Sequence, residues 1–157
     1  MRRIFLSVLL VAFATFGLSF IGVEVEKLQD TMPVSVRLDA SIFSVMYPIG
    51  VVDPNTMEFQ LAPSATSFDY TQLLVGLNLK LPLGSLYIRG AGYLNLQQVM
   101  DYQQTNQITV FGKVGAGLKL LFLDAEGGVR WYYRVFPTST EFQFAPEELY
   151  IALGLSF

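Results

Sequence analysis

Cysteine and histidine are both missing from this chain of 157 residues. Without cysteine there can be no disulfide, no thiolate metal site and no lipid-modified cysteine. Without histidine the chain lacks the commonest general base and the commonest ligand for transition metals. The Gly-x-Gly at Gly115 and Gly117 lies within a strand pattern and no helix pattern follows it, so it does not predict a phosphate loop. We expect no enzymatic activity, no cofactor and no metal, and we expect these glycines to make room for bulky side chains.

Charge is scarce as well. Charged residues make up 15 % of the chain, against about 25 % in soluble domains. The formal net charge is −3 and the sequence has no basic run, which argues against a nucleic-acid partner. Apolar residues reach 52 %, with 13 Phe and 8 Tyr. This composition suits one membrane β-barrel domain with aromatic girdles, although a soluble β-protein with a large core would share it.

The N-terminus has the organisation of a secretory signal peptide. Arg2 and Arg3 are followed by an uncharged stretch over residues 4–23, with small residues at Gly17 and Ser19. A basic start, an apolar middle and a small-residue exit predict a cleavable signal peptide over residues 1–19 and a mature domain over residues 20–157. Cleavage after Ala14 is a second possibility. An uncleaved transmembrane helix is the alternative, because the stretch approaches the ~20 residues that a span needs.

Alternation of apolar and polar residues recurs through the rest of the chain, and this period of two predicts strands rather than helices. Seven strands are expected at residues 21–25, 34–42, 73–81, 86–96, 108–120, 123–135 and 149–157. An eighth is expected at residues 57–61, because a barrel with both chain ends on one side needs an even number of strands. The alternative makes residues 47–68 one long external loop. We predict an all-β fold, an antiparallel up-and-down transmembrane β-barrel of eight strands.

The predicted connections alternate in length. Residues 82–85 and the link near residues 122–124 are tight, whereas residues 97–107 and 136–148 are long and polar. Outer-membrane barrels have short turns on the periplasmic side and long loops outside, so the pattern predicts that orientation here. Trp131 and Tyr133 lie on the apolar face near one end of their strand, where aromatic rings anchor a barrel at the membrane interface. Packing in the core of a soluble barrel is the alternative.

Charged side chains share one face of the predicted strands. A Lys or Arg that faces lipid at mid-membrane costs about 2–4 kcal/mol, so a membrane barrel should point this face inward. The predicted interior network consists of Arg37, Asp39, Lys80, Arg89, Lys113, Lys119, Glu126, Arg130 and Arg134, with Glu24 and Glu26 on the same face. Eight strands leave an interior just wide enough for side chains, and buried charges need partners. We expect a plug of ion pairs, with a conducting, anion-attracting pathway as the alternative.

The chain closes with Tyr-Ile-Ala-Leu-Gly-Leu-Ser-Phe157, an alternating strand that finishes on an aromatic residue. With the signal peptide and the amphipathic strands, it resembles small bacterial outer-membrane β-barrel proteins of the OmpA/OmpX type. The resemblance covers residues 20–157 and is architectural. It implies a place in the outer membrane of a double-membraned bacterium, and a signal for the barrel-assembly machinery formed by Tyr150, Leu153, Leu155 and Phe157. We expect residues 149–157 to face lipid and to pair with the strand around residues 23–25.

The expected function is a non-enzymatic structural or surface-interaction role, carried out by a monomer in contact with outer-membrane lipid. Loops at residues 100–106 and 138–144 would be presented to partners. A narrow channel, or a barrel that binds a small ligand, is the first alternative. A soluble periplasmic carrier of the lipocalin type is the second, and it would reverse the faces, with apolar residues inside and Arg and Lys in water.

Overall fold

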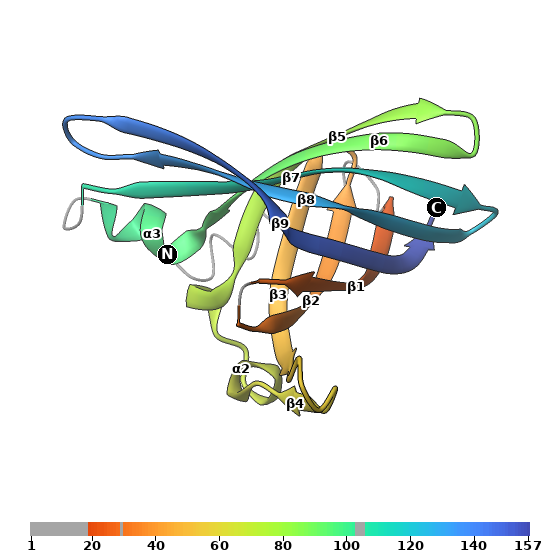
Figure 1. Cartoon of the computed structure of the whole chain (residues 1–157), viewed down its shortest axis with the longest axis horizontal. Helices are drawn as coiled ribbons and strands as arrows, with labels where there is room; N and C mark the ends of the chain where they lie inside the picture. The colour runs from red at the N-terminus through yellow and green to blue at the C-terminus, as the bar shows by residue number, and fades with distance from the viewer. Residues whose placement is uncertain (1–18, 29, 103–105) are drawn as a thin grey trace.

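The described residues, 19–28, 30–102 and 106–157 of a computed structural model, form a closed antiparallel barrel of eight strands (Figure 1). The wall consists of β1 (Phe20–Lys27), β2 (Met32–Ala40), β3 (Phe43–Val52), β5 (Leu74–Leu83), β6 (Leu86–Asn95), β7 (Ile108–Leu120), β8 (Leu123–Val135) and β9 (Thr140–Ser156). The predicted all-β, up-and-down architecture is confirmed. The predicted signal peptide lies outside the described residues, except for Ser19.

The barrel is closed by pairing of the first and last strands. Val23 lies opposite Leu153 and Val25 opposite Ile151, in a register that covers the whole of β1. The backbone N–H of Phe157 also donates to the carbonyl of Ser19 at 3.2 Å. The expected pairing of the terminal strand with residues 23–25 is therefore confirmed, and no edge is left between these two strands over the length of β1.

The third wall strand is not the one predicted. β3 (Phe43–Val52) pairs with β2 and β5, whereas β4 (Phe59–Leu61), within the predicted strand at residues 57–61, pairs only with the far end of β3. The expected total of eight is right. Residues 59–61 of the predicted strand at 57–61 do form a strand, but it is not a strand of the closed wall, and the alternative of one loop from residue 47 is wrong because β3 extends to Val52. Inward Ser44 and Met46 alternate with outward Phe43 and Val45, so both faces contain large apolar residues. A strand of this kind lacks the polar face that makes alternation visible in a sequence.

The expected loop at residues 136–148 is also wrong. Residues 140–148 are the first half of β9, and they continue the hairpin with β8 from Val135–Thr140 to Arg130–Ala145. A tight turn joins the strands, with the N–H of Phe136 donating to the carbonyl of Ser139 at 2.9 Å. Residues 146–148 form a bulge where the register shifts, and Pro146 is tolerated there because a bulge interrupts the hydrogen-bond ladder. We call residues 130–145 the β8–β9 arm.

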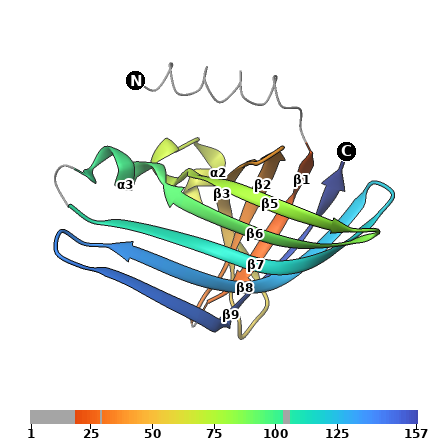
Figure 2. The same cartoon turned by 90° about the horizontal axis from the view of Figure 1, so that it is seen from above.

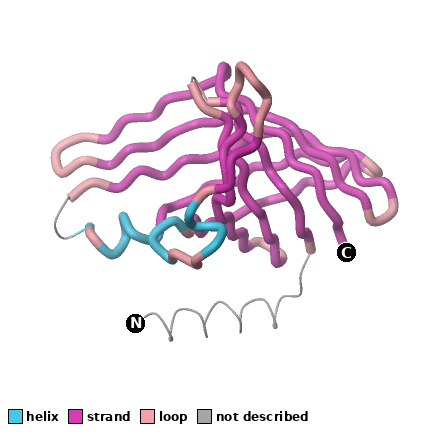
Figure 3. The backbone as a smooth tube through the Cα atoms, turned by 90° about the horizontal axis from the view of Figure 1, so that it is seen from below, coloured by secondary structure: helices cyan, strands magenta, loops and turns pink. Residues whose placement is uncertain are grey.

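The two ends of the barrel differ in how the strands are joined. Tight turns at residues 41–42, 84–85 and 121–122 lie at one end with Phe157, and we call it the short-turn end (Figure 2). The opposite end carries β4, α2 (Pro63–Thr66), the 3-10 helix η1 (Tyr70–Gln72), α3 (Leu96–Met100) and the tip of the β8–β9 arm. Figure 3 shows the helices gathered away from the C-terminus. The expected contrast between short and long connections is right except at residues 136–148.

Candidate functional site

The interior of the barrel is lined by charged and aromatic side chains rather than by aliphatic ones. Alternation along each strand points Glu24 and Glu26 of β1, Arg37 and Asp39 of β2, and Glu126 of β8 to the same side of the wall. All five are buried. The largest fully buried side chains include two arginines, one lysine and the aromatic residues Phe20, Tyr93 and Tyr150. The region that would be an apolar core in a soluble domain is therefore an ion-pair network.

The carboxylate of Glu126 is the centre of this network. Arg37 donates to both of its oxygens, at 3.1 Å each, and Arg89 donates at 3.0 Å. The hydroxyl of Tyr150 donates at 2.8 Å, and the hydroxyl of Tyr87, whose shorter contact is to Asp124, lies 2.9 Å from the same carboxylate. A carboxylate has about four lone-pair sites, so these donors saturate it. Because the donors come from β2, β6 and β9, one side chain of β8 ties together four strands.

A second set of ion pairs extends the network along the barrel axis. The ammonium group of Lys113 contacts both Glu24 and Glu26. Glu24 also accepts from Arg37 at 2.8 Å, and Glu26 also accepts from Arg130. Each acid thus bridges two basic groups, and strands β1, β2, β7 and β8 are joined through charge-assisted hydrogen bonds.

Asp39 links the network to the wall strand that the sequence pattern missed. It lies 3.5 Å from the Arg37 guanidinium and 3.9 Å from that of Arg89, and it accepts from the hydroxyl of Ser44 at 2.6 Å. Ser44 is also 2.8 Å from the Tyr93 hydroxyl. Ser44 was missed because β3 was missed, whereas Tyr87 and Tyr93 alternate with the apolar face of β6 and that period locates them.

Aromatic rings and glycines complete the filling of the interior. The Arg37 guanidinium lies 4.2 Å from the centroid of the Phe20 ring, a cation–π geometry. A Cβ at Gly117 would lie 2.1 Å from the ring of Tyr87, and one at Gly115 would lie 2.5 Å from the Tyr150 hydroxyl. The expectation that these two glycines make room for bulky side chains is confirmed.

The predicted network residues divide into three groups. Arg37, Asp39, Arg89, Lys113, Glu126 and Arg130 lie together in the buried interior. Lys80 is partly exposed and lies 3.4 Å from Asp124, and Arg134 lies 3.6 Å from Glu141 on the β8–β9 arm. Lys119 is exposed and takes part in none of the ion pairs among the described residues.

Charges inside the barrel are close to balanced. The basic members are Arg37, Lys80, Arg89, Lys113 and Arg130, and the acidic members are Glu24, Glu26, Asp39, Asp124, Glu126 and Glu148. Five positive and six negative groups leave a formal charge of −1 over the described ion pairs. The interior therefore has no large surplus of positive charge that would attract anions.

The outward face is apolar and exposed. Its large apolar side chains, which we call the apolar belt, are Ile21, Val23, Leu77, Leu79, Leu81, Leu83, Leu86, Ile88, Val114, Leu118, Leu120, Leu123, Leu149, Ile151, Leu153, Leu155 and Phe157. Trp131 packs beside Phe142 at a centroid distance of 6.1 Å, at the base of the β8–β9 arm. Of the residues predicted to form an assembly signal, Leu153, Leu155 and Phe157 are in the belt, whereas Tyr150 is buried inside.

None of the helices in the described part of the chain has the length and apolar character needed to cross a membrane. Within residues 19–28, 30–102 and 106–157, no group of three or more acidic side chains is arranged to hold a metal ion. Comparisons with protein-family models, with curated proteins and with solved structures find no significant match.

Proposed function

We propose that this chain is an integral outer-membrane β-barrel with a non-enzymatic structural or surface-interaction role and a filled interior. The observation that carries the proposal is the orientation of the two faces, with paired charges inside and the apolar belt outside. Soluble monomers rarely expose contiguous apolar surface on this scale. A soluble carrier of the lipocalin type would need the opposite arrangement, with apolar side chains around its ligand.

The filled interior favours a structural barrel over a channel. Arg37 spans from β2 to Glu126 on β8, and Lys113 spans from β7 to Glu24 on β1, so the ion pairs cross the lumen from wall to wall. These groups are fully buried. A solute that crossed the barrel would have to separate them, and an unpaired buried charge is strongly unfavourable.

The surface-interaction part of the proposal concerns the end opposite the short turns. The β8–β9 arm, α3 and the segment from β4 to η1 lie there, and by the orientation of outer-membrane barrels this end would face outward. Residues 140–144, expected to be a loop, would present partners with a strand rather than a flexible segment. In this proposal the barrel is monomeric, contacts lipid and uses the barrel-assembly machinery during biogenesis.

Cell fractionation combined with heat-modifiable gel mobility tests the membrane proposal. The full-length chain is expressed in a double-membraned bacterium, and the outer-membrane and periplasmic fractions are run with and without boiling. We expect a detergent-extracted monomer whose unboiled form migrates faster than its boiled form. Recovery of the mature chain in the aqueous periplasmic fraction would overturn the proposal.

Two measurements on the reconstituted protein test the remaining parts. Planar bilayers should show no conductance above the lipid background, and reproducible single-channel steps would replace the filled barrel with the channel alternative. Trp131 is the only tryptophan, and brominated lipids should quench its emission if the apolar belt faces lipid. Emission that is insensitive to these lipids would argue for a soluble barrel.

A further inference from the structure

The turns at the short-turn end are apolar where turns in water are usually polar. The connecting tetrapeptides are Ala40-Ser-Ile-Phe43, Leu83-Gly-Ser-Leu86 and Leu120-Leu-Phe-Leu123, and none contains a charged residue. The third, which we call the apolar turn, is apolar throughout. Leu121 is 87 % exposed and Phe122 is 58 % exposed, so no other part of the described chain covers them.

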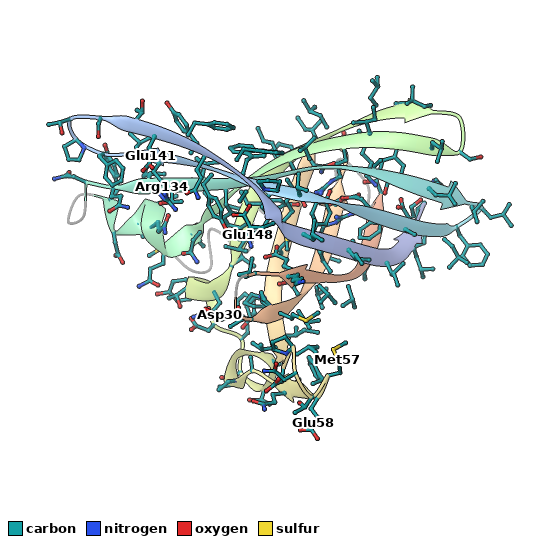
Figure 4. The ribbon with its side chains drawn as sticks, in the orientation of Figure 1. Asp30, Met57, Glu58, Arg134, Glu141 and Glu148 are labelled. Carbon is teal, nitrogen blue, oxygen red and sulfur yellow. The ribbon has the colours of Figure 1, made fainter. Side chains whose placement is uncertain are left out.

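The opposite end of the barrel has the reverse character. Its connections contain Asp30, Asp53, Glu58, Asp69 and Asp101. Figure 4 shows Asp30 and Glu58, together with the Arg134–Glu141 pair of the β8–β9 arm, away from the short-turn end. Charges in connecting segments are therefore confined to one end. At the other end the outward-facing belt continues onto the apolar turn, and exposed Lys119, next to this turn, belongs to the inward face.

The backbone at the apolar turn makes the exposed leucine more informative. Leu121 has φ 57°, in the left-handed region that disfavours residues with a Cβ. The other two tight turns place Ser41 and Gly84 in this conformation, which are small or polar residues. A leucine gains nothing from water at such a position, so its presence indicates an apolar surrounding for the side chain.

The height of the belt indicates what that surrounding is. Trp131 and, two residues further on, Tyr133 are outward aromatic side chains of β8, and they mark the upper aromatic boundary. Leu123 lies eight residues before Trp131 and ten before Tyr133 on the same strand, a rise of ~26–33 Å along β8 and ~20–25 Å along the barrel axis at a tilt of about 40°. The apolar band of an outer-membrane barrel is ~25 Å tall. A band of that height, measured down from these aromatic rings, ends at Leu123 or up to ~5 Å beyond it, which is the level of the apolar turn.

We propose that the apolar turn, Leu120–Leu123, inserts into the inner boundary of the same bilayer that surrounds the barrel. Its occupant is lipid, the acyl chains and adjoining headgroups of the periplasmic leaflet, and Phe122 with Phe157 forms the lower counterpart of the aromatic boundary at Trp131. The short-turn end then stops within the membrane interface rather than projecting into the periplasm. This inference rests on the membrane proposal above.

Single-tryptophan variants test the depth of the turn. In a Trp131→Phe background, tryptophan is placed at Leu121, at Phe122 or, as the matched control, at exposed Thr138 in the turn of the β8–β9 arm. Each protein is folded into phosphatidylcholine vesicles in which bromine sits near the headgroup or near the chain end. Two sites in the turn are used because tryptophan at Leu121 has to accept a positive φ.

We expect the emission of Leu121→Trp and Phe122→Trp to be blue-shifted from that of Thr138→Trp and to be lost most strongly with bromine near the headgroup. Emission that matches Thr138→Trp and ignores bromine would overturn the inference, and so would blue-shifted emission without quenching, which indicates protein contact. Trp131 of the unaltered chain separates the two proposals. If it is quenched and the turn is not, the inference alone fails, and if neither is quenched the membrane proposal fails too.

Discussion

Replacing Glu126 with glutamine should strongly destabilise the barrel. The amide keeps the size of the side chain but removes the charge that is shared by Arg37 and Arg89, both of which are fully buried. It also offers one carbonyl oxygen in place of two carboxylate oxygens, so hydroxyls such as that of Tyr150 lose acceptors. Removing one partner of a buried ion pair costs about 3–5 kcal/mol, because the other partner is left buried and uncompensated. The equilibrium constant for unfolding should rise by roughly two to four powers of ten.

The assay is denaturant unfolding of the protein in phospholipid vesicles, followed by the emission of Trp131 and by the gel-mobility shift. Glu141→Gln is the matched control, because it makes the same chemical change in a pair that is exposed to solvent. Glu141 lies 3.6 Å from Arg134 and is 58 % exposed, so its loss should cost about 0–1 kcal/mol. If the two variants unfold at the same denaturant concentration, the interior is hydrated, and the filled-barrel argument fails.

A double-mutant cycle separates loss of the ion pair from loss of packing. Arg89→Met in the Glu126→Gln background removes one of the two cations left without a partner and keeps an unbranched side chain in its place. We expect the double variant to be more stable than the sum of the single effects predicts, with a coupling of about 0.5–3 kcal/mol. Strictly additive effects would mean that Arg89 and Glu126 do not interact energetically, despite their 3.0 Å hydrogen bond.

Three further outcomes are expected. Gly117→Ala should destabilise the folded barrel by about 1–3 kcal/mol in the same unfolding assay, because the new methyl group meets a tyrosine ring of β6. Gly90→Ala is the control, because nothing lies within 4 Å of its added Cβ, and it should have no such effect. Equal losses of stability in the two variants would refute the packing argument. Lys113→Gln should lower the free energy of unfolding by about 3–5 kcal/mol, because it leaves two buried glutamates without their lysine, whereas Lys119→Gln at an exposed site should change it little. Phe157→Ala should reduce the heat-modifiable fraction in cells without a matching loss of stability in vesicles, and an unchanged fraction would argue against an assembly role.

Alternation predicted those parts of the barrel in which one face is charged and the other is apolar and exposed. Leu86, Ile88 and Leu94 against Tyr87 and Arg89 show this on β6, and the structure has that strand as expected. β3 was not predicted, because its inward residues include Met46 rather than a charged residue. The first half of β9 was not predicted as a strand, because Pro146 and the polar residues before it are typical of a loop sequence. In the structure Pro146 occupies a bulge.

The partners of each charged side chain could not be read from the pattern. Glu126 and Arg37 are 89 residues apart and meet only because the ring closes between β1 and β9. Periodicity reports which face a residue occupies, but the height at which it lies depends on register and on the stagger of the strands. Lys119 and Arg134 show this limit. Both occupy the predicted inward face, yet each lies near the C-terminal end of its own strand. Because β7 and β8 are antiparallel, the two residues lie at opposite ends of the barrel, outside the buried part of the network.

The interior network also fixes the register of the wall. A slip of β8 by one residue would exchange its faces, so that Asp124, Glu126 and Arg130 would point outward while Ala125 and Gly127 replaced them inside. In a bilayer, a single outward Arg costs about 2–4 kcal/mol, and the cations left inside would lose their acceptor as well. In a soluble protein an apolar core specifies register through packing, but in the proposed bilayer the surrounding lipid would itself be apolar and would give an aliphatic side chain little reason to turn inward. The charges therefore select the arrangement of strands, and a barrel filled with aliphatic residues of equal volume would lose that selectivity even if its stability were unchanged.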